Sequence, residues 1–137
     1  MKLSNTSQYA IRILTYMADK QDTQRINAKD LSQTLDIPYK FLTKIMTDLV
    51  KVGFIVSIRG REGGYRFEKE ISDISIEDIL KTFNDEIKDE ACILGIGYCN
   101  NTCKCALHDQ WLDSKIALQK MFKESSIDTL VGEGNKV

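Results

Sequence analysis

Hydrophobic residues recur at helical spacing from the start of the chain. A first helix is predicted to begin near Thr6 or Ser7, either of which can cap it, and to end near Lys20. Its apolar positions follow the pattern i, i+1, i+4, i+5 and i+8, at Tyr9, Ala10, Ile13, Leu14 and Met17. A short second helix is predicted over residues 28–35, with Asn27 as its N-cap.

A third helix is predicted after Pro38, because proline suits the first turn of a helix, and Gly53 is its expected end. Its apolar face contains Phe41, Leu42, Ile45, Met46, Leu49 and Val50. The opposite face has two cations, two hydroxyls and an aromatic ring, from Tyr39, Lys40, Thr43, Lys44 and Thr47. Two helices joined by a tight turn, after a leading helix, fit a helix-turn-helix unit.

The pattern then changes to that of a β-hairpin. Phe54–Ile58 is rich in β-forming residues, 60–64 is a glycine-rich turn, and Tyr65–Phe67 is a second short strand. A hairpin directly after a helix-turn-helix predicts a winged helix, so the expected fold class is mainly α with a small β-hairpin. Turn chemistry alone explains the glycines, but Arg59 and Arg61 beside them can reach a phosphate backbone or a minor groove. The candidate DNA-binding residues are Tyr39, Lys40, Thr43, Lys44, Arg59 and Arg61.

The second half of the chain begins with a further helix start at Ser75, where Ser75 and Asp78 resemble a capping box. Residues 84–90 are acidic and expected to be exposed. A long helix is predicted over 109–124, followed by a frayed tail over 125–137. The broad apolar stripe of this helix either packs on its own domain or forms a dimer interface with a second subunit; it contains Trp111, Leu112, Ile116, Leu118, Met121 and Phe122.

Charge divides the chain into two unequal halves. Residues 1–69 contain 12 Lys/Arg and 7 Asp/Glu, a net charge of +5, and residues 70–137 contain 7 and 13, a net charge of −6. A basic half beside an acidic half favours contact between the first half and a polyanion. Chance clustering is the alternative, because a net charge of +5 is modest for this length.

All four cysteines and the one histidine lie between Cys92 and His108. Six residues separate Cys92 from Cys99, five separate Cys99 from Cys105, and two separate Cys105 from His108, with Cys103 inside the second gap. Thiolates are the usual ligands of iron–sulfur clusters, and an imidazole can replace one of them. Zinc also accepts three cysteines and a histidine, although structural zinc usually takes tighter cysteine pairs. A metal-free thiol switch, with a Cys103–Cys105 or Cys92–Cys99 disulfide, is a third hypothesis.

Several motifs together resemble the Rrf-type family of winged-helix repressors, which includes iron–sulfur regulators, over nearly the whole chain. They are Met1-Lys2-Leu3-Ser4 with Tyr9-Ala10, then Ile37-Pro38-Tyr39-Lys40-Phe41-Leu42, and the wing signature Arg59-Gly60-Arg61-Glu62-Gly63-Gly64-Tyr65. The resemblance implies that Cys92, Cys99 and Cys105 bind an iron–sulfur cluster and that His108 completes the site, which favours 2Fe–2S over 4Fe–4S. Cys103 is an extra thiol for which three roles stay open: a substitute for His108 as fourth ligand, a resolving thiol, or a spectator.

The resemblance also implies a homodimer that is joined through helix 109–124 and binds a pseudo-palindromic operator in double-stranded DNA. The expected division is a winged helix-turn-helix domain over 1–83, a cluster-binding loop over 84–108, and a dimerisation helix with a flexible tail over 109–137. The expected function is a transcriptional repressor that senses iron–sulfur, redox or nitric oxide status. Two departures stand out: the first cysteine gap is one residue longer than the commonest spacing, and Gln8 stands where some members place a carboxylate ligand.

Other classes of protein fit the sequence less well. It has no Walker-type or dinucleotide glycine motif and no His-Glu-x-x-His, and its one histidine lies among thiols, so no enzyme is predicted. No apolar run approaches the roughly 20 residues of a membrane span, and the N-terminus is no secretory signal, which predicts a cytoplasmic protein. A small electron-transfer protein would have no use for a basic wing, and a metal-independent repressor would not need the cysteine loop.

Overall fold

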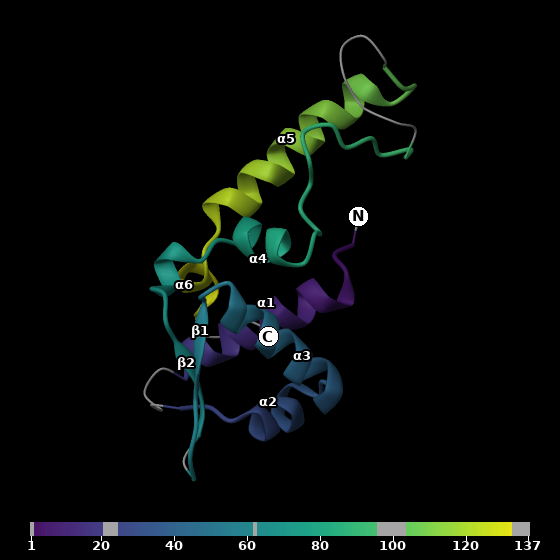
Figure 1. Ribbon diagram of the computed structural model, residues 1–137. Coiled ribbons are helices and arrows are strands. Elements are labelled where there is room, and N and C mark those ends of the chain that lie inside the picture. Colours follow the sequence, from purple (N-terminus) through teal and green to yellow (C-terminus); the bar gives the residue numbers. More distant parts are fainter. Residues whose placement is uncertain (1, 21–24, 62, 96–103, 133–137) are drawn as a thin grey trace.

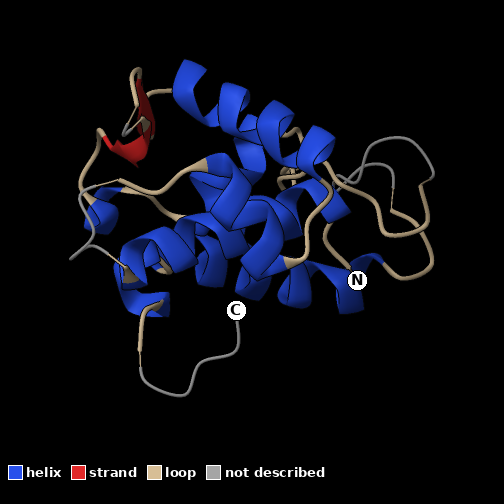
Figure 2. Cartoon of the chain, turned by 90° about the horizontal axis from the view of Figure 1, so that it is seen from below, coloured by secondary structure: helices blue, strands red, loops and turns tan. Residues whose placement is uncertain are grey.

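The computed structural model describes residues 2–20, 25–61, 63–95 and 104–132. Its α-helices and strands, labelled in Figure 1, are α1 (Asn5–Asp19), α2 (Ala28–Leu35), α3 (Tyr39–Lys51), β1 (Ile55–Ile58), β2 (Gly64–Phe67), α4 (Ile76–Thr82), α5 (His108–Glu124) and α6 (Ile127–Leu130). A short 3-10 helix, η1 (Ile71–Asp73), lies between β2 and α4. Figure 2 shows that helices make up the body and that the two strands lie at one edge. The prediction of a mainly α fold with a small β-hairpin is confirmed.

Helix α1 begins earlier than the sequence pattern predicted. The Ser4 side chain accepts a hydrogen bond from the Ser7 N–H (3.2 Å), so Ser4 is the N-cap, and the prediction of Thr6 or Ser7 is wrong. Ser7 is itself fully buried, which removes it from a capping role at the helix surface. The end of the helix agrees with the prediction, since Lys20 is its C-cap.

The helix-turn-helix is held by polar contacts at the turn between α2 and α3. Asp36 closes α2 in the left-handed conformation (φ 53°), and the Ile37 N–H donates to the Ser32 carbonyl (3.1 Å). The Ser32 hydroxyl donates back to the Ile37 carbonyl (2.6 Å). From α1, the Arg12 guanidinium donates to the Leu35 carbonyl (2.8 Å), which satisfies one of the carbonyls left open at a helix end. The turn between α2 and α3 is therefore held by contacts from α1 and α2.

The hydrophobic core joins α1 to α3, β1, α4 and α6. Its largest fully buried side chains are Ile13, Leu14, Leu31, Ile37, Leu42, Met46, Leu49, Ile55, Ile74, Ile79, Leu80 and Ile127. The predicted apolar face of α3 is partly wrong, because Phe41 is 62% exposed. Only the narrower stripe of Leu42, Ile45, Met46 and Leu49 is buried. Phe41 instead lines a surface groove together with Tyr9 and Phe83.

The wing is an antiparallel hairpin in which Ile55 pairs with Phe67 and Ile58 pairs with Gly64. Tyr65 also pairs with Ile26 on the outer side, through two backbone hydrogen bonds of 2.8 and 3.2 Å. A Cβ at Gly64 would lie 2.7 Å from the Ile26 carbonyl oxygen, a distance that real Cβ atoms essentially never show. The glycine is required because the segment before α2 lies directly against the wing.

The chain after α5 returns to the core instead of fraying. Ile127 is fully buried, its N–H donates to the Ile74 carbonyl (2.9 Å), and Ser126 forms a bridge with Ser75. The Ile76 N–H donates to the Ser125 carbonyl (2.8 Å). The predicted frayed tail over 125–137 is therefore wrong for residues 125–130, and 133–137 lie outside the described residues.

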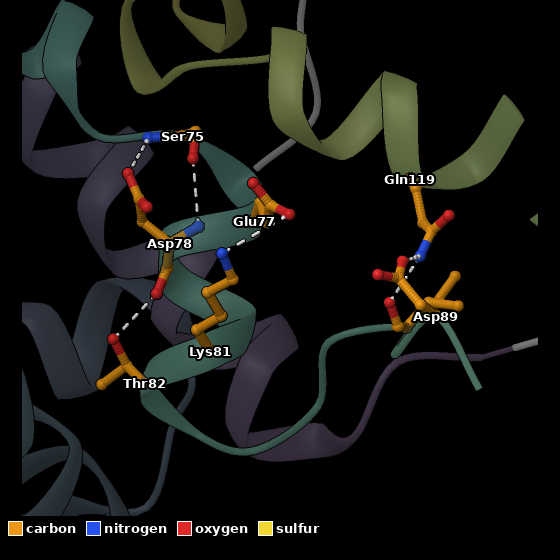
Figure 3. A network of polar contacts seen from close by, with 8 residues as sticks. Ser75, Glu77, Asp78, Lys81, Thr82, Asp89 and Gln119 are labelled. Carbon is orange, nitrogen blue, oxygen red and sulfur yellow. Dashed lines mark hydrogen bonds and ion pairs between the residues drawn. The ribbon is translucent and has the colours of Figure 1, made fainter. Parts of the chain in front are cut away.

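Two other predictions for the second half are confirmed. Ser75 and Asp78 form the predicted capping box, in which each side chain accepts from the backbone N–H of the other (Figure 3). Helix α5 begins one residue before the predicted 109 and ends at Glu124. Its C-terminal end lies next to α6, beside the core, and its N-terminal end lies far from α2 and α3 (Figure 1). No helix in the described part of the chain is long and apolar enough to cross a membrane.

Candidate functional site

The polar face of α3 is available to a ligand. Tyr39 is 56% exposed, Lys40 and Lys44 are exposed, and Thr43 is half-buried. The Thr43 hydroxyl donates to the Lys40 carbonyl (3.1 Å). Because its proton is used inside the helix, the Thr43 oxygen presents acceptor lone pairs outward. The predicted residues of the helix therefore share one surface, with cations at two points and an acceptor between them.

The arginines of the wing also lie at the surface. Arg59 and Arg61 are exposed at the tip of the hairpin, and Arg66 is exposed on β2. Within the described ranges no ion pair engages Arg59 or Arg61. Their charges are thus available to an anion. The structure brings two sets of predicted DNA-binding residues to the surface, one on α3 and one on the wing.

The sequence interpretation missed residues that connect the wing to the helix-turn-helix. Burial, and then the charge interaction with Tyr39, raises the pKa of the Tyr65 phenol above its ordinary value of 10.0. Tyr65 therefore stays neutral in the physiological range and remains a hydrogen-bond donor.

Two further residues that the sequence interpretation missed lie on α2, where Lys29 and Gln33 line a shallow pocket with Tyr39. Their spacing of four residues on an exposed face was the available sequence signal.

The two ends of the cysteine loop, which is the segment from Cys92 to His108, lie at the start of α5. His108 is the first residue of α5, is 4% exposed, and donates its N–H to the Cys105 carbonyl (3.1 Å). The Trp111 indole donates to the Ala91 carbonyl (2.9 Å), which places the residue before Cys92 one turn from His108. Cys92 and Cys105 are both half-buried. Three of the predicted cluster residues are therefore on chain segments that meet at one end of α5.

Two predicted residues of the loop, Cys99 and Cys103, lie outside the described residues. Among the described residues, no three side chains of Cys, His, Asp or Glu are grouped closely enough to hold a metal ion. The Gln8 amide donates to the Leu3 carbonyl (2.6 Å). The described donors are two thiols and one imidazole, which suit an iron–sulfur cluster or zinc.

The chain before Cys92 follows α5 over a longer distance. The Gln119 amide donates to the Ile87 carbonyl (2.9 Å) and to the Asp89 carboxylate (3.2 Å), and Figure 3 shows Gln119 directed from α5 toward Asp89. The Lys115 ammonium donates to the Asp89 carbonyl. Lys115 is 4% exposed, although the sequence gives no sign of a buried lysine.

The predicted dimer residues on α5 face in different directions. Ile116 and Met121 are 54% and 50% exposed. Phe122 packs against the hydrophobic core of its own chain. Trp111, Leu112 and Leu118 are half-buried, and the indole of Trp111 is bonded to its own chain. Phe122 thus fits the hypothesis that the stripe packs on its own domain. Ile116 and Met121 fit the hypothesis that it forms a dimer interface.

The fold, together with the polar surface of α3 and the wing, defines a winged helix-turn-helix regulator of transcription that binds DNA. The chain belongs to the Rrf2 family, described as "Iron-dependent Transcriptional regulator", which it matches over residues 3–133. The predicted family resemblance is confirmed.

Relatives with assigned names are also regulators of transcription, not enzymes. The chain is 33% identical over 133 residues to a putative HTH-type transcriptional regulator of Aquifex aeolicus, covering 96% of this chain and 92% of that protein. It is 33% identical over 95 residues to the regulator NsrR of Bacillus licheniformis, covering 69% and 66%. It is 24% identical over 131 residues to the regulator IscR of Vibrio atlanticus, covering 96% and 75%.

Solved structures share the fold. CymR, the global cysteine regulator of B. subtilis, superposes with a TM-score of 0.78 at 21% identity, over 95% of each chain. The T. potens IscR superposes with a TM-score of 0.71 at 18% identity, over 93% of this chain and 84% of that one. The fold of this chain is thus that of solved proteins.

Proposed function

We propose that this chain is a homodimeric transcriptional repressor whose DNA binding responds to an iron–sulfur cluster, 2Fe–2S, held by Cys92, Cys99, Cys105 and His108. The observation that carries the proposal is the Trp111–Ala91 hydrogen bond, because it brings the start of the cysteine loop to the helical turn that begins with His108. The family description as iron-dependent and the relatives named NsrR and IscR support it.

The donor set suits a 2Fe–2S cluster. Three thiolates and one imidazole supply the four ligands that two iron atoms need, and the imidazole raises the potential relative to four thiolates. When bound, such a cluster supplies a centre whose oxidation state and integrity follow the redox, iron–sulfur or nitric oxide status around it. His108 is nearly fully buried, which limits access of water to that side of the site. Cys103 is the substitute fourth ligand, and 4Fe–4S is the alternative cluster.

In DNA binding, α3 would contact bases and phosphates, and the arginines of the wing would contact the phosphate backbone. The recognition helix α3 would enter the major groove, where Tyr39, Lys40, Thr43 and Lys44 meet bases or phosphates. The outward lone pairs of Thr43 favour an amino-group donor, adenine N6 or cytosine N4, as its base partner. Lysine and arginine contacts to phosphate contribute affinity without sequence preference.

The outward residues of α5 would form the dimer interface. Ile116 and Met121 are exposed on a helix that extends from the core, and they are the apolar side chains of the predicted set that a second copy could cover. Two copies related by a two-fold axis would present two α3 helices to successive major grooves, about 34 Å apart, on a pseudo-palindromic operator. Replacement of Ile116 and Met121 by aspartate should give monomers in analytical ultracentrifugation, and unchanged dimers would refute this interface.

Anaerobic purification, with iron, sulfide and zinc measured per chain, tests the cluster. About two iron and two sulfide per chain with an EPR signal on reduction support 2Fe–2S, and His108→Ala should then change that signal. About four of each would favour 4Fe–4S. Zinc alone would make the loop structural, and a metal-free protein after reconstitution would leave a thiol switch of the same fold. The last two results refute the cluster proposal.

A further inference from the structure

Three side chains on one stripe of α5 bind alternate carbonyls of the chain that leads into the cysteine loop. Trp111, Lys115 and Gln119, here called the α5 clasp, are spaced four residues apart. They donate in turn to the backbone carbonyls of Ala91, Asp89 and Ile87, with distances of 2.9 Å at the first and last. The segment 87–91 therefore runs antiparallel to the helix, held at every second residue.

The three clasp residues lie along one side of α5. Four residues of an α-helix rise about 6 Å, so the clasp residues span about 12 Å on nearly one face. The segment 87–91 contains a turn, because the Ala91 N–H donates to the Lys88 carbonyl (2.9 Å). Three bonds in register resist both sliding and lifting of the segment, whereas a single bond would permit rotation about it.

The clasp uses a buried cation at its centre. Lysine is almost never fully buried unless it is paired, since removal of the ammonium from water is costly. Lys115 is 4% exposed and bonds the carbonyl of Asp89. Gln119 bonds the carboxylate of the same residue (3.2 Å). A bond from a charged donor is roughly twice as strong as a neutral one, so the centre of the clasp is its strongest point.

The clasp ends where the loop begins. Ala91 directly precedes Cys92, and Trp111 lies three residues after His108 on the same helix. We propose that Trp111, Lys115 and Gln119 are positioning residues, which hold Cys92 within reach of Cys105 and His108 and so set how firmly the loop retains its cluster. The retention part of this proposal rests on the proposed function, whereas the position of Cys92 does not depend on it.

Trp111→Phe and Lys115→Met test the proposal, because each keeps most of the side-chain volume and removes the donor. Lys120→Met is the matched control, since Lys120 is exposed on the same helix. The first measurement uses metal-free protein with Cys99 and Cys103 replaced by serine, and follows closure of a Cys92–Cys105 disulfide by diamide. Loss of one bond should slow closure about fivefold in Trp111→Phe and about tenfold in Lys115→Met, with no change in the control.

The second measurement follows cluster loss to an iron chelator in the full chain, where the same variants should lose the cluster about fivefold and tenfold faster. Closure at the unsubstituted rate, no closure even in the parent, or equal effects in Lys120→Met would overturn the clasp. Slower closure with unchanged cluster loss would overturn the retention role. A parent chain that takes up no cluster refutes the proposed function instead, and disulfide closure still decides whether the clasp positions Cys92.

Discussion

Replacement of Ile127 by alanine should strongly destabilise the protein, because the short helix α6 closes the core. Ile127 is fully buried, and its N–H is bonded to the carbonyl of Ile74, which is also fully buried. The substitution removes three carbon atoms, worth about 2.5 kcal/mol of transfer free energy at about 0.8 kcal/mol each. The cavity left behind adds to this, so the expected loss of unfolding free energy is about 3–4 kcal/mol.

Urea unfolding followed by circular dichroism measures this loss. With a slope of about 1.5 kcal/mol per molar urea, the midpoint of Ile127→Ala should fall by about 2 M. Ile127→Val removes one methyl group and should cost about 1 kcal/mol. Asp128→Ala, at an exposed position of the same helix where the carboxylate accepts from the Ser126 hydroxyl, should cost no more than about 1 kcal/mol. All variants are compared at one protein concentration, because the stability of a dimer depends on it.

A frayed tail would give different urea midpoints for these variants. If residues 125–130 did not pack on the core, then Ile127→Ala and Asp128→Ala would both leave the midpoint unchanged. A loss for Ile127→Ala below about 1 kcal/mol would refute the burial argument, since no Ile-to-Ala change in a closed core is so mild. An equal loss in both variants would mean that the effect does not come from burial of the Ile127 side chain, and helix propensity could not explain it either, because alanine raises helix propensity at both positions.

Three further predictions concern the DNA-binding half. Arg59→Ala and Arg61→Ala should each lower the slope of log affinity against log salt by about 0.9 if the side chain contacts phosphate, measured by fluorescence anisotropy from low to high salt. Gly64→Ala should cost about 1–3 kcal/mol in urea unfolding, because the new Cβ would lie 2.7 Å from the Ile26 carbonyl oxygen. Since the folded state raises the pKa of Tyr65 above 10.0, its contribution to stability is complete below pH 10.0 and is lost as the pH rises through the folded pKa. Tyr65→Phe should therefore flatten the alkaline fall in unfolding free energy.

Local sequence patterns predicted the helix-turn-helix and the wing well because their determinants lie within a few residues. The N-cap of Asn27 on the Asp30 N–H and the capping box of Ser75 with Asp78 need only neighbouring residues. The first N-cap was wrong because three hydroxyl residues stand close together, and packing, which buries Ser7, decides among them. Local pattern does not contain that information.

The errors in the second half have a similar physical origin. Helix α6 has four residues, too few to show a period, and its place depends on Ser126 meeting Ser75 across about fifty residues of sequence. The cysteines and His108 could be predicted from the sequence as candidate ligands, but the clasp could not. Lys115 and Gln119 bind backbone carbonyls, and a carbonyl carries no side-chain identity that a sequence pattern could reveal.

Helix α5 connects the cysteine loop to the DNA-binding half of the chain in the proposed mechanism, because each of its ends is attached to one of them. Its first residue is His108, in the cysteine loop, and the chain after its last turn is bonded to Ile74 and Ile76 at the edge of the DNA-binding domain. A change in the loop that moves α5 would therefore move the DNA-binding domain, and linkage requires the reverse to hold. If the cluster changes operator affinity tenfold, operator DNA must change cluster affinity tenfold, about 1.4 kcal/mol in each direction. Operator affinity measured with and without the cluster, and cluster affinity measured with and without operator DNA, should change by the same factor, and a factor of one in both would mean that the cluster and the operator are not coupled.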